Sequence, residues 1–217
     1  MNILLEQALQ QPFREPFWQT LLTEIFVNEQ LNLLPQPQAL AANEDCLRSV
    51  KQLGKLVLPD ANVLLLIIET GEQVQLNRNR VTLSAFLKRF LNDPDYDAVL
   101  AVFHQPNHPN WRITYASIYV SIDPETGVFQ NNETEPRRFS LLVGGNEPCC
   151  TAAERLAQIR DLRETLNLGE LEKAFSVEKL SKEFFDKYLI HYKAFVAELI
   201  SPERASETRA LFAVPTL

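Results

Sequence analysis

The chain has 217 residues, of which 46% are hydrophobic and 23% are charged, enough for one large or two small globular domains with a sizeable core. Its formal net charge of −7 excludes a general electrostatic attraction to nucleic acid, so any such binding requires a local basic face. Its three cysteines show no CxxC spacing, and its longest apolar run, Val63 to Ile68, is too short to span a bilayer. These features disfavour a zinc site, a disulfide framework and membrane insertion, and they predict a cytoplasmic protein.

The amino-terminal part is predicted to begin with two helices and to continue into a sheet. Apolar residues recur at helical spacing in Asn2 to Leu9 and in Pro16 to Val27. The prolines of Leu34 to Gln38 break this pattern and indicate a linker or an extended segment. Two strands and a helix are expected next, at Ser49 to Leu58, Val63 to Ile68 and Val81 to Leu91.

The middle of the chain is predicted to supply the remaining strands. Ala98 to His104 is apolar throughout most of its length, as a buried strand is. Trp111 to Ile122 alternates, with a change of phase near Ala116 that is typical of a β-bulge. Arg137 to Val143 returns to a strand pattern, and two glycines follow it.

The carboxyl-terminal third is predicted to be helical up to Phe212. Thr151 to Leu166 has apolar residues in helical register, and Thr151 is expected to be the N-cap. A long amphipathic helix is expected to begin at Ser181 and to run towards Leu199. Its apolar face would be covered either by this chain's own sheet or by a second copy in a homodimer.

These elements together predict an α/β (α+β) fold with a central mixed β-sheet flanked by helices and a helical carboxyl-terminal third. Residues 1–145 would form one part, with the amino-terminal helices and the sheet. Residues 146–217 would form a second, helical part.

Four segments resemble sequence blocks of one enzyme family. They are Trp111 to Tyr115, Arg137 to Gly144, Cys150 to Leu156 and Leu171 to Tyr188, and they occur in the family's order. Together with the run Asn77 to Arg80, they make the chain similar to the amino-terminal region of large restriction–modification adenine-specific DNA methyltransferases, of the type IIG and BREX-like kinds.

The resemblance implies that the chain is a fragment of a phage-defence enzyme, in which residues 146–217 lead towards a methyltransferase domain and the last helix docks on that domain. No methyltransferase activity is expected from the chain itself. It has no glycine-rich cofactor turn, and Asn92 to Tyr96 matches the loop that holds a flipped adenine in composition only. S-adenosylmethionine would therefore bind only in a downstream domain, and no cofactor is expected here.

The resemblance also implies a nuclease-like module of the PD-(D/E)XK kind. Such a site has an Asp on one strand and an acidic-x-Lys sequence on the next, so that two carboxylates bind Mg²⁺ and the lysine orients the attacking water. Asp60 and Glu69 flank a buried strand and are the candidate catalytic and metal-binding residues, whereas Gly71 stands where the lysine should be. The amine would have to be replaced by Gln73, Lys51 or Lys55. The alternative is a turn aspartate and a strand-end glutamate without catalytic function.

Basic residues supply the candidate DNA contacts. Arginine and lysine at intervals along one face can bind successive phosphates. The candidates are Arg78, Arg80, Lys88, Arg89, Arg112, Arg137 and Arg138. Solvated surface charge is the alternative interpretation. Separately, His104 and His108 flank a proline-containing loop, where they are either a metal-binding pair or two exposed imidazoles.

The sequence thus leaves three functions open. The first is a degenerate nuclease-like module that contributes DNA contact and domain organisation to a restriction–modification enzyme. The second is an active Mg²⁺-dependent endonuclease domain. The third is a protein-interaction module without DNA affinity.

Overall fold

The computed structural model describes residues 2–41, 44–76, 80–117, 121–122, 129–130 and 137–199. The chain divides into two compact units, Met1–Phe175 and Ser176–Leu217. The first unit contains a sheet and five helices among its described residues, and the second contains one long helix. The division expected after residue 145 is therefore not where the chain separates, because two further helices belong to the first unit.

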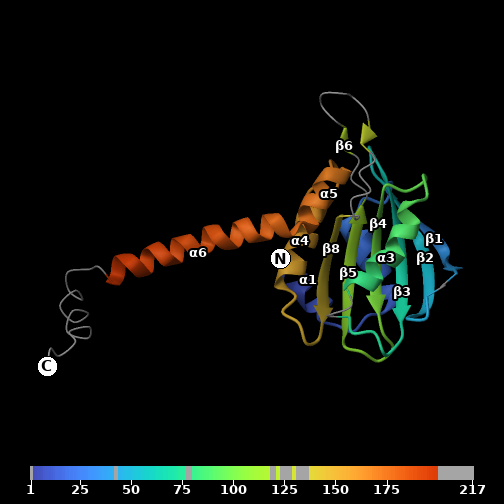
Figure 1. The fold of residues 1–217 in the computed structure, drawn as a ribbon, viewed down its shortest axis with the longest axis horizontal. Helices are drawn as coiled ribbons and strands as arrows, with labels where there is room; N and C mark the ends of the chain where they lie inside the picture. The colour runs from blue at the N-terminus through green and yellow to red at the C-terminus, as the bar shows by residue number, and fades with distance from the viewer. Residues whose placement is uncertain are drawn as a thin grey trace. The chain divides into compact units, whose positions relative to one another are not determined.

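A mixed six-stranded sheet forms the centre of the first unit (Figure 1). Its strands, in spatial order, are β1 (Leu31–Leu40), β2 (Leu47–Val57), β3 (Asn62–Thr70), β4 (Ala98–His104), β5 (Asn110–Ser117) and β8 (Arg137–Gly144). β3 and β4 are parallel, and every other neighbouring pair in this sheet is antiparallel. A two-stranded pair, β6 (Ser121–Ile122) and β7 (Phe129–Gln130), is separate from it. The expected mixed sheet with helices, of the α+β class, is confirmed.

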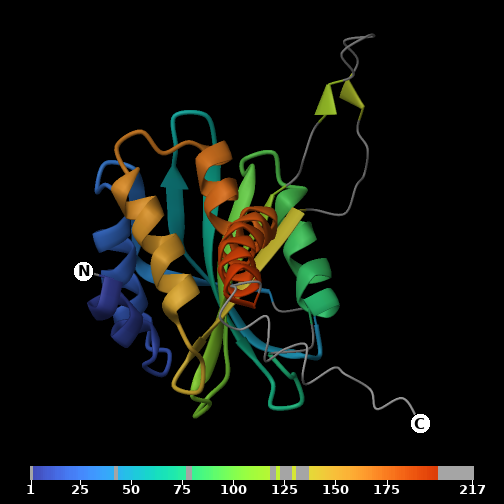
Figure 2. The same ribbon diagram turned by 90° about the vertical axis from the view of Figure 1, so that its left-hand side faces the viewer.

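Helices cover both faces of the sheet, as Figures 1 and 2 show. They are α1 (Asn2–Leu9), α2 (Glu15–Ile25), α3 (Arg80–Leu91), α4 (Cys150–Asp161) and α5 (Leu168–Phe175). The second unit contains α6 (Val177–Leu199). Helices α1, α2, α4 and α5 share one hydrophobic core with the sheet. Helix α3 connects the parallel strands β3 and β4 and packs on the opposite face.

Strand β3 is buried on both faces. Successive side chains of a strand point to opposite sides, and each side of the sheet is covered here by helices. Val63, Leu65 and Ile67 belong to the core under α1, α2, α4 and α5. Their neighbours Leu64, Leu66 and Ile68 belong to the core under α3. This double burial explains why the sequence is apolar without alternation here.

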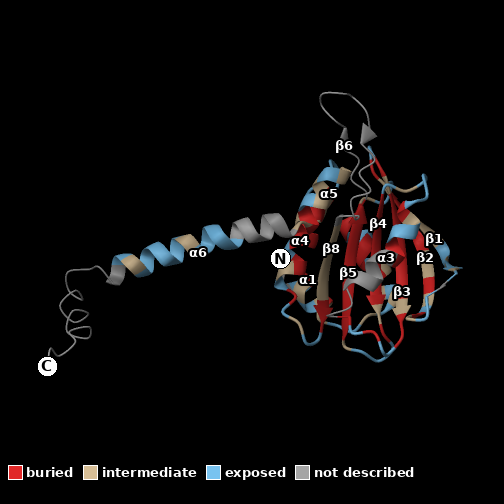
Figure 3. Cartoon of the chain, in the orientation of Figure 1, coloured by how far each residue is buried: buried red, intermediate tan, exposed pale blue. Residues whose placement is uncertain are grey.

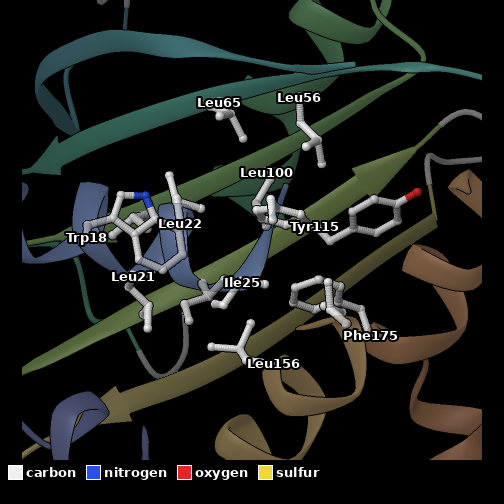
Figure 4. Close-up of a cluster of buried hydrophobic side chains, with 14 of the residues drawn as sticks. Trp18, Leu21, Leu22, Ile25, Leu56, Leu65, Leu100, Tyr115, Leu156 and Phe175 are labelled. Carbon is white, nitrogen blue, oxygen red and sulfur yellow. The ribbon is translucent and has the colours of Figure 1, made fainter. Parts of the chain in front are cut away.

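Aromatic side chains hold the larger core together (Figure 4). Trp18 of α2 meets Trp111 of β5 edge to face, with ring centroids 5.8 Å apart. The indole nitrogen of Trp111 donates to the backbone carbonyl of Gln11 at 2.9 Å. Tyr115 of β5 stacks on Phe175 of α5 at 5.5 Å, so α5 closes the end of this core.

Of the two alternatives for Leu34 to Gln38, a linker or an extended segment, the structure shows the extended one, and two helix starts differ from expectation. The segment Leu34 to Gln38 is part of edge strand β1, whose register with β2 shifts between Leu33 and Gln38. Helix α4 begins one residue before Thr151 and has Cys149 as its N-cap, without a side-chain capping bond. Helix α6 begins at Val177, so Ser181 lies within the helix and is not its start.

Within the described ranges, no helix combines the length and the apolar character needed to cross a bilayer.

Candidate functional site

Asp60 and Glu69 lie at opposite ends of β3 and cannot bind one metal ion together. Asp60 is in the turn between β2 and β3, whereas Glu69 is the next-to-last residue of β3. A strand rises by about 3.3 Å per residue, so the two carboxylates are separated by roughly the whole length of the strand. The prediction of an Asp60–Glu69 pair is therefore wrong in its geometry.

Asp60 has a structural role. Its two carboxylate oxygens accept from the backbone N–H of Leu168, at 3.0 and 3.3 Å. Leu168 is the first residue of α5, where backbone N–H groups have no partner within the helix. The carboxylate therefore satisfies the start of α5 and ties this helix to the β2–β3 turn.

Glu69 lies at the carboxyl end of the parallel pair β3 and β4. Its register partners are Ser49 on β2 and His104 on β4. The nearest cation recorded for it is Arg48, whose guanidinium is 3.9 Å from the Glu69 carboxylate and makes a closer bond of 3.0 Å to Glu72. Because the Arg48 and Glu72 side chains are substantially exposed, these contacts stabilise the fold only slightly.

Lys51 is the amine that the structure brings nearest to Glu69 along the sheet. Ser49 lies opposite Glu69 and Lys51 lies opposite Ile67, so Lys51 and Glu69 are diagonal neighbours on the same face. The Lys51 ammonium group forms an ion pair of 3.1 Å with Glu15, the first residue of α2. Of the other proposed replacements, Gln73 donates to the carbonyl of Asp45, and Lys55 lies opposite Leu64, further down the strand.

His104 completes a group of four polar residues at this edge, which we call the edge cluster: Glu15, Lys51, Glu69 and His104. Its imidazole stacks on Phe13, with ring centroids 4.4 Å apart. Burial lowers the pKa of His104, Lys51 lowers it further, and the carboxylates of Glu69 and Glu15 act in the opposite direction. All three neighbours are thus close enough to act on the imidazole electrostatically.

The edge cluster offers acids, an amine and an imidazole, but not a formed metal site. Mg²⁺ requires several oxygen ligands at short distance. Among the residues that the structure describes, no group of three or more His, Cys, Asp or Glu side chains could hold a metal ion. The Nδ1 atom of His108 lies 3.0 Å from the carbonyl oxygen and 3.1 Å from the backbone nitrogen of Asn110, so this imidazole nitrogen is engaged with the backbone of its own loop.

The predicted DNA contacts whose side chains the structure describes do not form one surface. Arg112 is only 3% exposed, on the face of β5 that α3 covers, so it cannot reach a phosphate without rearrangement. Lys88 and Arg89 are exposed near the end of α3, and the Arg89 guanidinium lies 5.2 Å from the rings of both Phe86 and Phe90. Arg138 is partly buried on β8. Arg78 and the side chains of Arg80 and Arg137 lie outside the described residues.

A polar hollow of about 520 Å³ lies near the carboxyl ends of β3 and β4. Its lining includes Glu72, Gln105, His108, Asn110 and Glu147. Asn110 donates to the Glu147 carboxylate at 3.2 Å, and Gln105 donates to the carbonyls of Gly71 and Val74. The two carboxylates disfavour a phosphate in this hollow.

Sequence reasoning selected Glu69 and Lys51 but missed Glu15 and gave His104 no partner on this face. Glu15 precedes Pro16 at the start of a helix, so in the sequence it looks like an ordinary acidic residue of a first helical turn.

Comparisons with protein-family models, with curated proteins and with solved structures found no match for this chain. The family resemblance therefore remains a prediction from its sequence blocks.

Proposed function

We propose that this chain is the amino-terminal, nuclease-like module of a restriction–modification adenine-specific DNA methyltransferase, with a degenerate site, and that it contributes DNA contact and domain organisation. The observation that supports this best is the edge cluster. It places Glu69 at the end of a buried strand, with Lys51 on the adjacent antiparallel strand and Glu15 on a covering helix. These are the residue types that a Mg²⁺-dependent nuclease uses.

The ion pair between Lys51 and Glu15 within the edge cluster supports a site that does not cleave DNA. Lys51 is engaged by Glu15 at 3.1 Å, which opposes its use in orienting a water molecule. The aspartate expected from the neighbouring strand, Asp60, instead binds the start of α5. Cleavage by metal-activated water needs at least one ion held by several carboxylates, and Glu69 alone does not provide this.

DNA contact is proposed for the exposed cations near the end of α3, Lys88 and Arg89. Arg78 and Arg80, which precede them in the sequence, are proposed to contribute as well. A gel-shift titration with a short duplex, at several salt concentrations, tests this proposal. We expect Lys88→Gln/Arg89→Gln to weaken binding and to reduce the salt dependence by roughly one unit of slope per lost phosphate contact. The matched control is Lys173→Gln/Arg163→Gln, which also removes two exposed charges. Absence of DNA affinity at low salt would refute the proposal.

The same gels, run with supercoiled plasmid and Mg²⁺ or Mn²⁺, separate the degenerate module from an active endonuclease. We expect no cleavage. Cutting that requires the metal and disappears in Glu69→Gln would instead establish the active endonuclease, with Mg²⁺ as cofactor. Lys51→Gln would then show whether this lysine replaces the amine missing at Gly71.

A second candidate is a protein-interaction module without DNA affinity. The observation that favours it is the row of exposed aromatic side chains on α6. A protein complex that resists high salt, formed by a chain that does not shift DNA, would support this candidate over the first.

A further inference from the structure

Large apolar side chains line one side of α6 and are exposed to solvent. The most exposed aromatic residues are Phe184, Phe185, Tyr188, Tyr192 and Phe195, with exposed fractions from 51 to 69%. Three of these rings stack along the helix, with centroid distances of 6.3 Å for Phe184–Tyr188 and 6.1 Å for Tyr188–Tyr192. Figure 3 shows most of the described part of α6 as exposed. We call these five residues, with Leu189 and Val196, the aromatic stripe.

The aromatic stripe contains no charged residue. At about 100° per residue, its members occupy an arc of roughly 140° around the helix. The charged residues of the same helical turns, Asp186, Lys187 and Lys193, lie outside this arc. Two copies of the stripe can therefore face each other without bringing like charges together, and its width exceeds the narrow seam of a simple two-stranded coiled coil.

Few large apolar side chains are exposed among the described residues of the first unit. Among the described residues of Met1–Phe175, the large apolar side chains that are exposed are Leu4 and Leu162. Most of the large apolar side chains that are exposed among the described residues thus lie on α6. A helix of this length depends on packing of its apolar face for most of its stability, so a matching surface is needed.

The area of the stripe suits a dimer. Aromatic side chains bury about 150–250 Å² each, so the exposed parts of its five rings amount to roughly 600 Å². Two such surfaces bury roughly 1,200 Å², which is the lower end of a specific protein–protein interface. Burial of Leu189 and Val196 adds to this.

We infer that the aromatic stripe of α6 is a self-association surface, and that its occupant is the α6 helix of a second copy of this chain. The stripe shares no residue with the edge cluster or with the cations of α3. The inference therefore does not depend on the proposed DNA contact.

Sedimentation equilibrium of the full chain over about 1–100 µM tests the inference. We expect at least twice the chain mass of 24.8 kDa, with little change between low and high salt because the contact is apolar. Tyr188→Glu/Phe195→Glu places charges within the stripe and is expected to yield monomers. The matched control is Ile190→Glu, because Ile190 is 67% exposed on the opposite side of the same helix and its substitution leaves association unchanged.

Circular dichroism of each variant measures its helix content and so shows whether a loss of association results from unfolding. If Tyr188→Glu/Phe195→Glu also loses helix content, the milder Tyr188→Ser/Tyr192→Ser replaces it, and the expectation of weaker association is the same. A wild-type chain that stays monomeric up to about 100 µM overturns the inference, and the stripe then packs against its own chain or a different protein. Equal loss of association in Ile190→Glu overturns it as well, because the contact would not lie on the stripe.

Discussion

The charge of the His104 imidazole depends on the fold. It is partly buried, stacks on Phe13 at 4.4 Å and lies among Glu69, Lys51 and Glu15. Burial favours the neutral form, which lowers the pKa of His104 from its ordinary value of 6.5. The folded protein thus resists protonation of a group that the unfolded chain protonates readily.

This difference predicts a loss of stability in mild acid. As the pH falls below about 6.5, the unfolded chain binds a proton that the folded chain does not, so the free energy of unfolding decreases until the lower folded pKa is passed. Urea unfolding between pH 7.5 and 5.5 measures this slope. His104→Phe keeps a ring against Phe13 and is expected to flatten the slope, whereas the exposed His191→Gln should leave it unchanged.

Individual residues show what the sequence could and could not reveal about the candidate site. Glu69 and Lys51 could be selected because a strand-end acid and a nearby amine are visible in the sequence. The role of Asp60 could not, because its partner Leu168 is 108 residues away along the chain. By residue type Arg112 looks like a surface cation. Side chains of β5 alternate between the two faces of the sheet, however, and Arg112 points to the face that α3 covers.

At the scale of elements, the β1–β2 pair depends on one glycine. Gly54 has a φ of +156° and lies at the register shift of β2. A Cβ atom at this position would overlap the backbone of Asn32 and Leu33 on β1. The two strands can therefore approach each other here only because residue 54 has no side chain.

Gly54→Ala is therefore expected to lower the free energy of unfolding by about 2–3 kcal/mol, since both the backbone conformation and the close approach are lost. Urea denaturation measures this change. Gly145→Ala is the control, because the nearest atom to its added Cβ, the carbonyl oxygen of Gln10, is at an ordinary contact distance of 3.5 Å. A cost below about 0.5 kcal/mol for Gly54→Ala would show that the strands can adjust.

The strands and helices of the central module were predictable because burial leaves a clear pattern. β3 and β4 are continuously apolar, and α3 shows helical spacing. The sequence of Leu34 to Gln38 leaves a linker and an extended segment open, because Pro35 and Pro37 cannot donate to a neighbouring strand. On an edge strand the side without a neighbour needs no donor, so the extended alternative is the one that forms. The expected start of α6 at Ser181 is wrong because a capping residue expresses only a local preference, and the helix begins four residues earlier, at Val177.

At the scale of the whole molecule, the first unit ends where its core closes. Phe175 is buried against Tyr115, and burial raises the pKa of this phenol. The boundary expected after residue 145 followed the change from strands to helices. It failed because α4 and α5 are held by tertiary packing on the sheet, which secondary-structure patterns do not reveal.

The resemblance blocks also coincide with packing positions. Trp111, Arg155, Leu156 and Leu171 are all buried, so several of the residues that carry the resemblance maintain the core of the first unit. None of the edge-cluster residues lies in these blocks. The blocks therefore bear on how the first unit packs. They do not bear on catalysis, which has to be tested at the edge cluster.

The edge-to-face contact of Trp18 with Trp111 gives the two units distinct optical signals. Both tryptophans of the chain lie in this one contact, so their fluorescence reports on the first unit, whereas α6 contributes 23 residues to the helical ellipticity and no indole. If copies join through α6, dilution should reduce the ellipticity at 222 nm while the emission maximum stays constant. Heating a concentrated sample, in which α6 is still helical, should then show two transitions by ellipticity and a single one by fluorescence, without any label being attached.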